Sequence, residues 1–196
     1  PLPIQKEKSI KPKSVVNMKK RIILASGRMH VYKQFDLLIK AFSDLSKIYL
    51  NWDLVILGNG DEREELQKLV LKLDIESRVH MPGSVGNISD WYERADIFAL
   101  SSAVEGFPNV LLEAMTYGLP CISFDCDTGP REMIQNNING ILIHPDKKEQ
   151  GLFIGLKRLI ENPELRVSIS NQAIKIRDQY SKNNIMQKWD NFLEQE

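Results

Sequence analysis

The chain has 196 residues, enough for one packed α/β domain and short for two. Its 26 Lys and Arg residues balance 26 Asp and Glu residues, so the overall charge does not favour nucleic acid or an acidic membrane surface as a partner. Cys121 and Cys126 match neither a disulfide framework nor a zinc ligand set. A reducing, cytoplasmic setting is therefore the default expectation.

The first segment of the chain, 1–20, contains Pro and many Lys but no periodic pattern of apolar residues. This composition predicts a linker rather than a folded element, and contact with anionic lipid is the less favoured alternative. A linker at this point leads us to expect another domain before it. The packed domain is expected to occupy residues 21–196.

From Arg21 onward, short apolar runs alternate with amphipathic helical patterns, and Asp61 is placed to cap the second helix. The expected strands are 21–26, 53–57, 78–81, 96–100, 120–124 and 140–143. Repeated strand–helix units predict an α/β fold with a doubly wound, parallel, six-stranded, Rossmann-like sheet. Such sheets bind ligands at the carboxyl ends of their strands.

The stretch from Glu105 to Glu113 is the most informative part of the sequence. Gly106 allows the backbone to approach a ligand closely, and Pro108 suits the first turn of a helix. The amides of 109–111 would then face whatever precedes the helix, a position that favours an anion such as phosphate. A carboxylate at each side can accept hydrogen bonds from hydroxyls, as sugars and riboses require.

Two other turns carry candidate ligand groups. Arg28 follows the first strand and Lys33 follows five residues later, so together they could hold a diphosphate; solvated surface charges are the alternative. Gly58-Asn59-Gly60 resembles half of a dinucleotide fingerprint, but no third Gly follows at the required offset. A tight turn into a helix is the favoured interpretation of this second motif.

Asp125-Cys126-Asp127 follows the fifth expected strand and could hold Mg²⁺ or Mn²⁺ on a nucleotide diphosphate. Acidic residues are also common where strands reach solvent, and this reading is favoured, so no metal site is predicted. A glycosidase pair at Glu105 and Glu113 is disfavoured as well. Their spacing corresponds to about 12 Å along a helix, whereas glycosidase carboxylates lie about 5–9.5 Å apart.

Taken together, these motifs resemble the retaining glycosyltransferases of the GT-B fold, specifically family 4, whose members carry an E-x7-E motif. The motifs occur in that family's order along nearly the whole chain: Gly27-Arg28 with Lys33, 58–60, 79–83, Ala95-Asp96 and 105–120. The resemblance implies only the C-terminal, donor-binding half of a GT-B enzyme. The helical face of Ile185, Trp189 and Phe192 would then pack toward a missing N-terminal domain.

The resemblance also implies residue roles. Arg28 and Lys33 would neutralise and stabilise the leaving diphosphate, Glu105 would hold hydroxyls of the transferred sugar, and Glu113 would accept from the ribose hydroxyls. The remaining implied donor-binding positions are Gly27, Gly106, Phe107, Asn109 and Val110, with the backbone near His80 and Met81 receiving the base. No side chain is an evident nucleophile, in agreement with the family's front-face retaining mechanism, which needs neither a metal nor another cofactor.

The chain departs from the family pattern at two places. Lys33-Gln34 stands where many members have Lys-Gly, and Asp127 to Glu132 replaces a usual Gly-Gly pair. The second variant is similar to enzymes that build bacterial surface polysaccharides and lipid-linked oligosaccharides from UDP sugars. We therefore expect transfer of a hexose or N-acetylhexosamine from a UDP sugar to such an acceptor, in the cytoplasm or at the inner face of the membrane.

Two other functions remain open. A sugar-nucleotide epimerase can share the GT-B fold, although no matching acid–base set is evident in this sequence. A non-catalytic binding module would be expected to lose Arg28, Lys33 or Glu113, and all three are present. The chain alone is expected to bind the donor weakly and to transfer nothing, since the acceptor site would lie on the missing domain.

Overall fold

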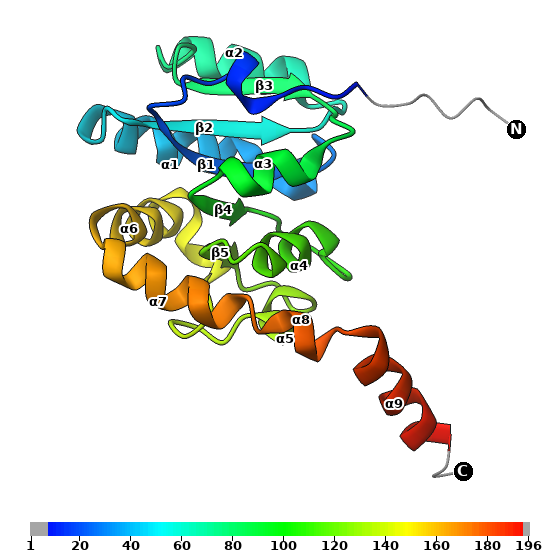
Figure 1. The fold of residues 1–196 in the computed structure, drawn as a ribbon. Helices are drawn as coiled ribbons and strands as arrows, with labels where there is room; N and C mark the ends of the chain where they lie inside the picture. The colour runs from blue at the N-terminus through cyan, green and yellow to red at the C-terminus, as the bar shows by residue number, and fades with distance from the viewer. Residues whose placement is uncertain (1–7, 194–196) are drawn as a thin grey trace, which may run out of the picture.

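A computed structural model of the chain describes residues 8–193 (Figure 1). Its six strands form one sheet, in which all paired strands are parallel. The strands are β1 (Arg21–Ser26), β2 (Trp52–Leu57), β3 (Val79–Gly83), β4 (Ile97–Leu100), β5 (Cys121–Phe124) and β6 (Ile141–Ile143). Their spatial order is β3-β2-β1-β4-β5-β6, which confirms the predicted doubly wound sheet. The order reverses between β1 and β4, so a ligand is expected beyond the carboxyl ends of these strands.

Helices cover both faces of the sheet. The core cluster on one face contains side chains from α1 (Phe35–Ile48), α2 (Arg63–Lys72) and α6 (Lys148–Glu161). The cluster on the other face contains side chains from α3 (Ile88–Arg94), α4 (Asn109–Thr116), α5 (Pro130–Met133) and α8 (Ile176–Gln179). The remaining elements are η1 (Pro12–Ser14), η2 (Val31–Lys33), η3 (Pro145–Lys147), α7 (Pro163–Ala173) and α9 (Lys182–Leu193).

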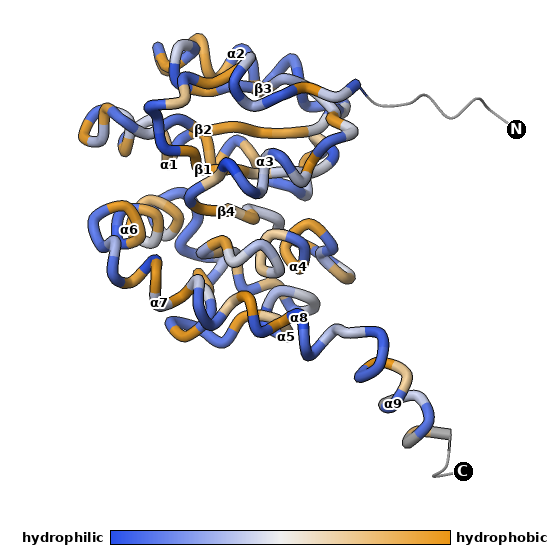
Figure 2. Tube along the Cα trace, in the orientation of Figure 1, coloured by the Kyte–Doolittle hydropathy of each residue, from blue (hydrophilic) through white to orange (hydrophobic). Residues whose placement is uncertain are grey.

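The continuous apolar sequence of β1 follows from its position inside this sandwich. Ile22 and Leu24 belong to the cluster beneath α3 and α4, whereas Ile23 and Ala25 belong to the cluster beneath α1 and α6. Successive side chains of a strand point to opposite faces, and both faces of this sheet are covered. The central strands are therefore apolar at nearly every position, as the orange colour of β2 shows in Figure 2.

Two local expectations differ from the structure. β3 continues through Pro82 to Gly83 instead of ending at Met81, because β3 lies at the edge of the sheet, where a residue without an N–H is tolerated. The residue before α2 is Glu62, and no side chain caps this helix. Asp61 therefore does not cap α2 as predicted.

The described part of the predicted linker, residues 8–20, packs on the domain. The amide of Ile10 donates to Asn87 Oδ1 (2.8 Å), and its carbonyl accepts from Trp91 Nε1 (3.0 Å). The side chain of Val16 is buried in the cluster beneath α3. This segment is therefore packed rather than free, and its connection to a preceding domain stays a prediction.

The last helix, α9, extends away from the body of the domain (Figure 1). Trp189 and Phe192 on this helix are exposed, and their rings pack edge to face at 6.4 Å. The predicted packing of this helix against another domain therefore stays a prediction. No helix in the described part of the chain combines the length and the apolar character needed to cross a bilayer.

Candidate functional site

A cavity of about 300 Å³ lies at the carboxyl ends of β1, β2 and β3. Its lining residues are Ser26, Gly27, Arg28, Leu57, Gly58, Asn59, Ser84, Val85 and Ile88. The lining combines apolar and polar side chains, as small-molecule sites commonly do. The cavity lies at the edge of the sheet where the topology predicts ligand binding.

The loops after β1 and β2 are joined through their backbones. The amide of Gly27 donates to Leu57 O (3.0 Å), and the amide of Met29 donates to Asn59 O (2.9 Å). Gly58 has a φ of 124°, and a Cβ at this position would lie only 2.0 Å from Gly27 O. Only glycine allows this approach, so the tight-turn interpretation of Gly58-Asn59-Gly60 is confirmed.

Lys33 and Glu105 form an ion pair beside the cavity, although 72 residues separate them in the sequence. Lys33 Nζ lies 2.6 Å from Glu105 Oε1, and the Lys33 side chain extends past Gly27. The Glu105 side chain is only 10% exposed, so solvent screens the pair weakly. The structure thus brings together two of the predicted catalytic residues.

Glu105 is held by side chains that the sequence did not single out. Ser102 Oγ donates to Glu105 Oε1 (2.6 Å), and Thr128 Oγ1 donates to the Glu105 carbonyl. The Cys126 thiol donates to Ser102 O (3.0 Å). Burial, followed by the nearby charge of Glu105, raises the pKa of Cys126 to about 11, so this thiol remains a neutral donor near pH 7.

The segment from Glu105 to α4 only partly matches the predicted anion site. Gly106 opens onto free space, as expected of a residue facing a ligand. The amides of Asn109 and Leu111 donate to Phe107 O and Pro108 O at 2.9 Å each, so both are already used. Among the described residues, no acceptor contacts the amide of Val110, which leaves it for a ligand.

Phe107 is 47% exposed, and its ring packs edge to face on Tyr180 at 5.7 Å. This contact joins the loop before α4 to the segment that leads into α9. Phe107 is therefore at the surface, and its ring is held by contact with the Tyr180 ring.

Glu113 lies on α4 with an exposed side chain. Its Oε2 accepts a hydrogen bond from the Tyr92 hydroxyl (2.9 Å), and no other hydrogen bond or ion pair reaches this carboxylate from the described residues. Glu113 thus combines one fixed oxygen with one available oxygen, an arrangement suited to accepting hydroxyl donors.

Arg28 lines the cavity, and its guanidinium lies 3.3 Å from Asp61 Oδ2. Both side chains are exposed, so the pair is screened by water and contributes little to stability. Asp61, in the loop after β2, thus contacts Arg28, in the loop after β1. Arg28 remains free to turn toward an anion in the cavity.

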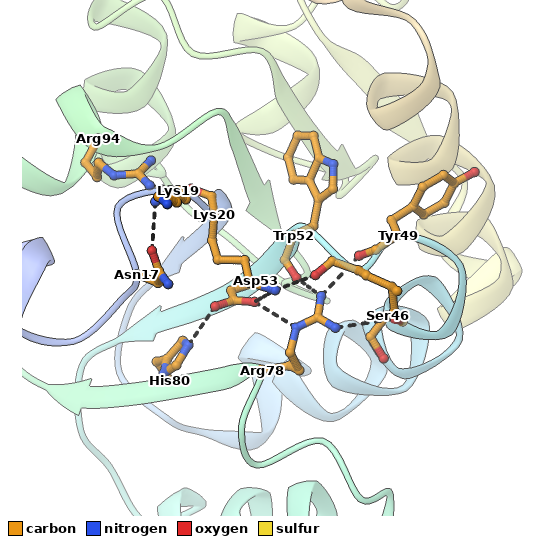
Figure 3. Close-up of polar contacts among 11 residues, drawn as sticks. Asn17, Lys19, Lys20, Ser46, Tyr49, Trp52, Asp53, Arg78, His80 and Arg94 are labelled. Atoms are coloured by element: carbon orange, nitrogen blue, oxygen red, sulfur yellow. Dashed lines mark hydrogen bonds and ion pairs between the residues drawn. The ribbon is translucent and has the colours of Figure 1, made fainter.

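Neither His80 nor Met81 is among the residues that line the cavity, and the role of their backbone toward the base stays a prediction. His80 Nε2 lies 3.1 Å from Asp53 Oδ2, and Asp53 also accepts from Arg78 Nε at 2.8 Å (Figure 3). The carbonyl of Met81 accepts from the Arg63 guanidinium at 2.6 Å. Ser84 and Val85, just beyond β3, line the cavity instead.

The Asp125-Cys126-Asp127 motif is engaged by a basic side chain. Arg131 Nε lies 2.9 Å from Asp125 Oδ1, while Cys126 is buried. Across residues 8–193, no group of three or more His, Cys, Asp or Glu side chains gathers as a metal site would require. The predicted independence from metals nevertheless stays a prediction.

Comparison with known proteins establishes the family. The family model of "Glycosyl transferases group 1" matches residues 6–176, which is most of the chain. The chain therefore belongs to this family. Family membership and the Rossmann-like domain of GT-B glycosyltransferases agree with the predicted resemblance, whereas the assignment to family 4 and the retaining outcome stay predictions.

The relatives and a solved structure support this assignment. The chain is 35% identical to an uncharacterized glycosyltransferase of Haemophilus influenzae, over 91% of this chain and 50% of that protein. It is 33% identical to a Campylobacter jejuni N-acetylgalactosaminyltransferase whose name includes a diphospho-undecaprenol substrate, over 81% of this chain and 42% of that protein. It superposes on a mutant form of S. aureus TarM, solved with UDP, with a TM-score of 0.82 and 26% identity, covering 93% of this chain and 36% of that one.

The chain spans about half the length of the curated relatives that it matches. The other half of each relative therefore has no counterpart in these 196 residues.

Proposed function

We propose that the chain is the donor-binding half of a retaining glycosyltransferase. It would take a hexose or N-acetylhexosamine from a UDP sugar and deliver it to a polysaccharide or lipid-linked glycan. The observation that carries this proposal is the Lys33–Glu105 pair beside the cavity at the carboxyl ends of β1 and β2. The names of the relatives, which include lipid-linked acceptors, and the UDP in the TarM structure support it.

The cavity itself suits the nucleoside. Val85 and Ile88 supply apolar contacts for a flat base, and Asn59 and Ser84 supply polar groups at the same wall. Base recognition would thus involve residues just after β3 in addition to the backbone near His80 and Met81. Glu113 would accept hydrogen bonds from the ribose hydroxyls, since one of its oxygens has no partner among the described residues.

The diphosphate would lie beside Lys33, Arg28 and the Val110 amide. Lys33 has three donor hydrogens and shares one hydrogen bond with Glu105, so it can contact a phosphate oxygen without leaving that carboxylate. Arg28 would exchange Asp61 for a phosphate, because an exposed ion pair is easily replaced. Positive charge and an amide donor at this position stabilise the negative charge of the leaving diphosphate.

The proposed chemistry requires no protein nucleophile. The bond between the anomeric carbon and the diphosphate oxygen breaks, and the acceptor oxygen bonds to that carbon on the same face. The acceptor proton passes to the leaving phosphate oxygen. Glu105, held by Ser102 and Thr128, would fix the hydroxyls of the transferred sugar during this step.

Nucleotide titration tests this proposal. Calorimetry of the chain with UDP, GDP and ADP, with and without Mn²⁺, is expected to show preferential, metal-independent binding of UDP. Glu113→Ala should weaken UDP binding about tenfold to a hundredfold, because a charge-assisted hydrogen bond contributes about 1.5–3 kcal/mol.

Glu161→Ala on α6 is a matched control, since it removes a carboxylate from the helix layer on the other face of the sheet. Equal weakening by both substitutions, or no preference among the nucleotides, would contradict the proposal. Mixing the chain with a UDP sugar and acceptor should give no transfer, because the acceptor site would belong to the other half of the enzyme.

A further inference from the structure

We propose that Tyr92 is a positioning residue for nucleotide binding, acting through Glu113; this inference rests on the function proposed above. Tyr92 lies on α3, one helical turn after Ile88, which lines the cavity. Its hydroxyl donates to Glu113 Oε2 (2.9 Å) on the neighbouring helix α4. Helix α3 thus contributes a wall of the cavity and fixes the carboxylate assigned to the ribose.

The Tyr92 ring is itself held in place by packing. Its side chain is 2% exposed, and the ring lies 6.0 Å from Phe98 of β4 in an edge-to-face arrangement. The ring of Tyr117, just after α4, lies 5.3 Å away on another side. A side chain locked by such contacts cannot follow Glu113 if the carboxylate rotates. The hydrogen bond therefore fixes Glu113 relative to the sheet.

The Tyr92 hydroxyl is held in its protonated form, so that it acts as a hydrogen-bond donor. Burial, followed by the nearby charge of Glu113, raises the pKa of Tyr92 well above its ordinary value. The hydroxyl therefore stays protonated near pH 7. It occupies one carboxylate oxygen and leaves the other for the ribose hydroxyls.

Glu113 needs this support because it is exposed. An exposed Glu side chain samples several rotamers, and binding a ligand to one of them costs conformational entropy. The Tyr92 hydroxyl selects one rotamer before the ligand arrives. A second, longer contact from this hydroxyl to Val110 O (3.4 Å) places it close to the start of α4 as well.

A ligand that lacks the ribose hydroxyls separates positioning from simple structural support. The experiment measures the affinity of the wild type and Tyr92→Phe for UDP and for 2′,3′-dideoxyuridine diphosphate. Phe keeps the packed ring, so the fold should persist, which the thermal unfolding midpoint checks. Tyr92→Phe is expected to weaken UDP binding about fivefold, and to change binding of the dideoxy nucleotide less than twofold.

Tyr49→Phe is the matched control. The Tyr49 hydroxyl also donates to a glutamate, Glu161 Oε1 at 2.5 Å, but Tyr49 directly follows α1 and Glu161 ends α6, in the other helix layer. This variant should bind both nucleotides as the wild type does. In the Glu113→Ala background, which removes the acceptor of the Tyr92 hydroxyl, adding Tyr92→Phe should cost less than twofold in UDP affinity.

The possible outcomes are distinguishable. Equal losses for both nucleotides, or no loss for UDP, would overturn the positioning role while leaving the proposed function intact. If the wild-type chain binds neither nucleotide, the proposed function and this inference both fail. If Tyr92→Phe and Glu113→Ala weaken UDP binding additively, Tyr92 acts independently of Glu113 and the inference is wrong.

Discussion

Two nearly buried carboxylates at opposite ends of the sheet show how differently one kind of side chain can be used. Asp53 lies near the amino end of β2, where it contacts Arg78 at 2.8 Å and His80 at 3.1 Å (Figure 3). Glu105 lies beyond the carboxyl end of β4 and pairs with Lys33. Both charges are matched, but their partners differ in how many donors remain for a ligand.

The Arg78 partner of Asp53 is saturated. The Arg78 guanidinium also donates to the carbonyls of Tyr49 and Trp52, so its N–H groups are already used by acceptors within the protein. Lys33, in contrast, makes one side-chain hydrogen bond and is 21% exposed on its side chain. The comparison indicates that a saturated cluster holds the fold together, whereas a cluster with spare donors can respond to a ligand.

Removing the charge of Asp53 should have the largest effect on stability. Asp53→Asn leaves Arg78 nearly buried without its counter-charge, a change that costs about 2–4 kcal/mol of unfolding free energy. Urea denaturation at pH 7 measures this loss. The UDP affinity of the folded variant should equal that of the wild type. A stability loss below about 1 kcal/mol would contradict a structural role for the cluster.

The pH dependence of the same substitution sharpens the comparison. Burial raises the pKa of Asp53, but the hydrogen bonds from His80 and Arg78 outweigh burial and hold the pKa below its usual 3.8. A depressed pKa in the folded state adds stability above pH 3.8, and this stability is lost as the pH falls through the folded-state pKa. The stability difference between wild type and Asp53→Asn should therefore shrink as the pH falls below 3.8, measured by thermal unfolding.

Breaking the Lys33–Glu105 pair should affect binding more than stability. Lys33→Met leaves the Glu105 charge with Ser102 as its side-chain donor, which costs about 1–2 kcal/mol of stability. Adding Glu105→Gln should restore part of this loss, because the uncompensated charge is gone. UDP affinity should fall at least about tenfold in both variants, since one charge-assisted contact is missing. Unchanged UDP affinity would exclude Lys33 from the diphosphate site.

The exposed pair of Arg28 and Asp61 should show the smallest effect. Asp61→Asn is expected to change the unfolding free energy by less than about 0.5 kcal/mol, because water and salt screen both side chains. Freed from its partner, Arg28 should bind UDP slightly more tightly, by less than about threefold at low salt. A loss of UDP affinity would mean that Asp61 orients Arg28 rather than competing for it.

Much of the fold was predictable from the sequence because the signals are local. The first predicted strand, 21–26, matches β1 residue for residue, and the other strands agree within a few residues. β3 was predicted to end at Met81 because Pro82 usually interrupts a strand. The position of β3 at the sheet edge, which depends on the whole topology, removes that penalty.

The candidate site was predictable only in part. Glu105 and Lys33 were identified individually, but no sequence signal pairs residues that lie 72 positions apart. The hydroxyl of Ser102, two residues after the end of β4, offered one usable signal, because side chains at the carboxyl ends of parallel strands gather at one edge. Tyr92 offered none, since an aromatic residue on an apolar helix face is ordinarily part of the core.

The sequence by itself determined the alternation of strands and helices, the parallel sheet and the edge at which ligands are expected, since backbone periodicity and turn chemistry act over a few residues. Only the tertiary structure decided that Lys33 pairs with Glu105, that the Tyr92 hydroxyl donates to Glu113 and that His80 contacts Asp53. Each of these contacts depends on strand order and on the packing of helices across the core. Those features arise from the chain as a whole, because distant segments must share one close-packed interior.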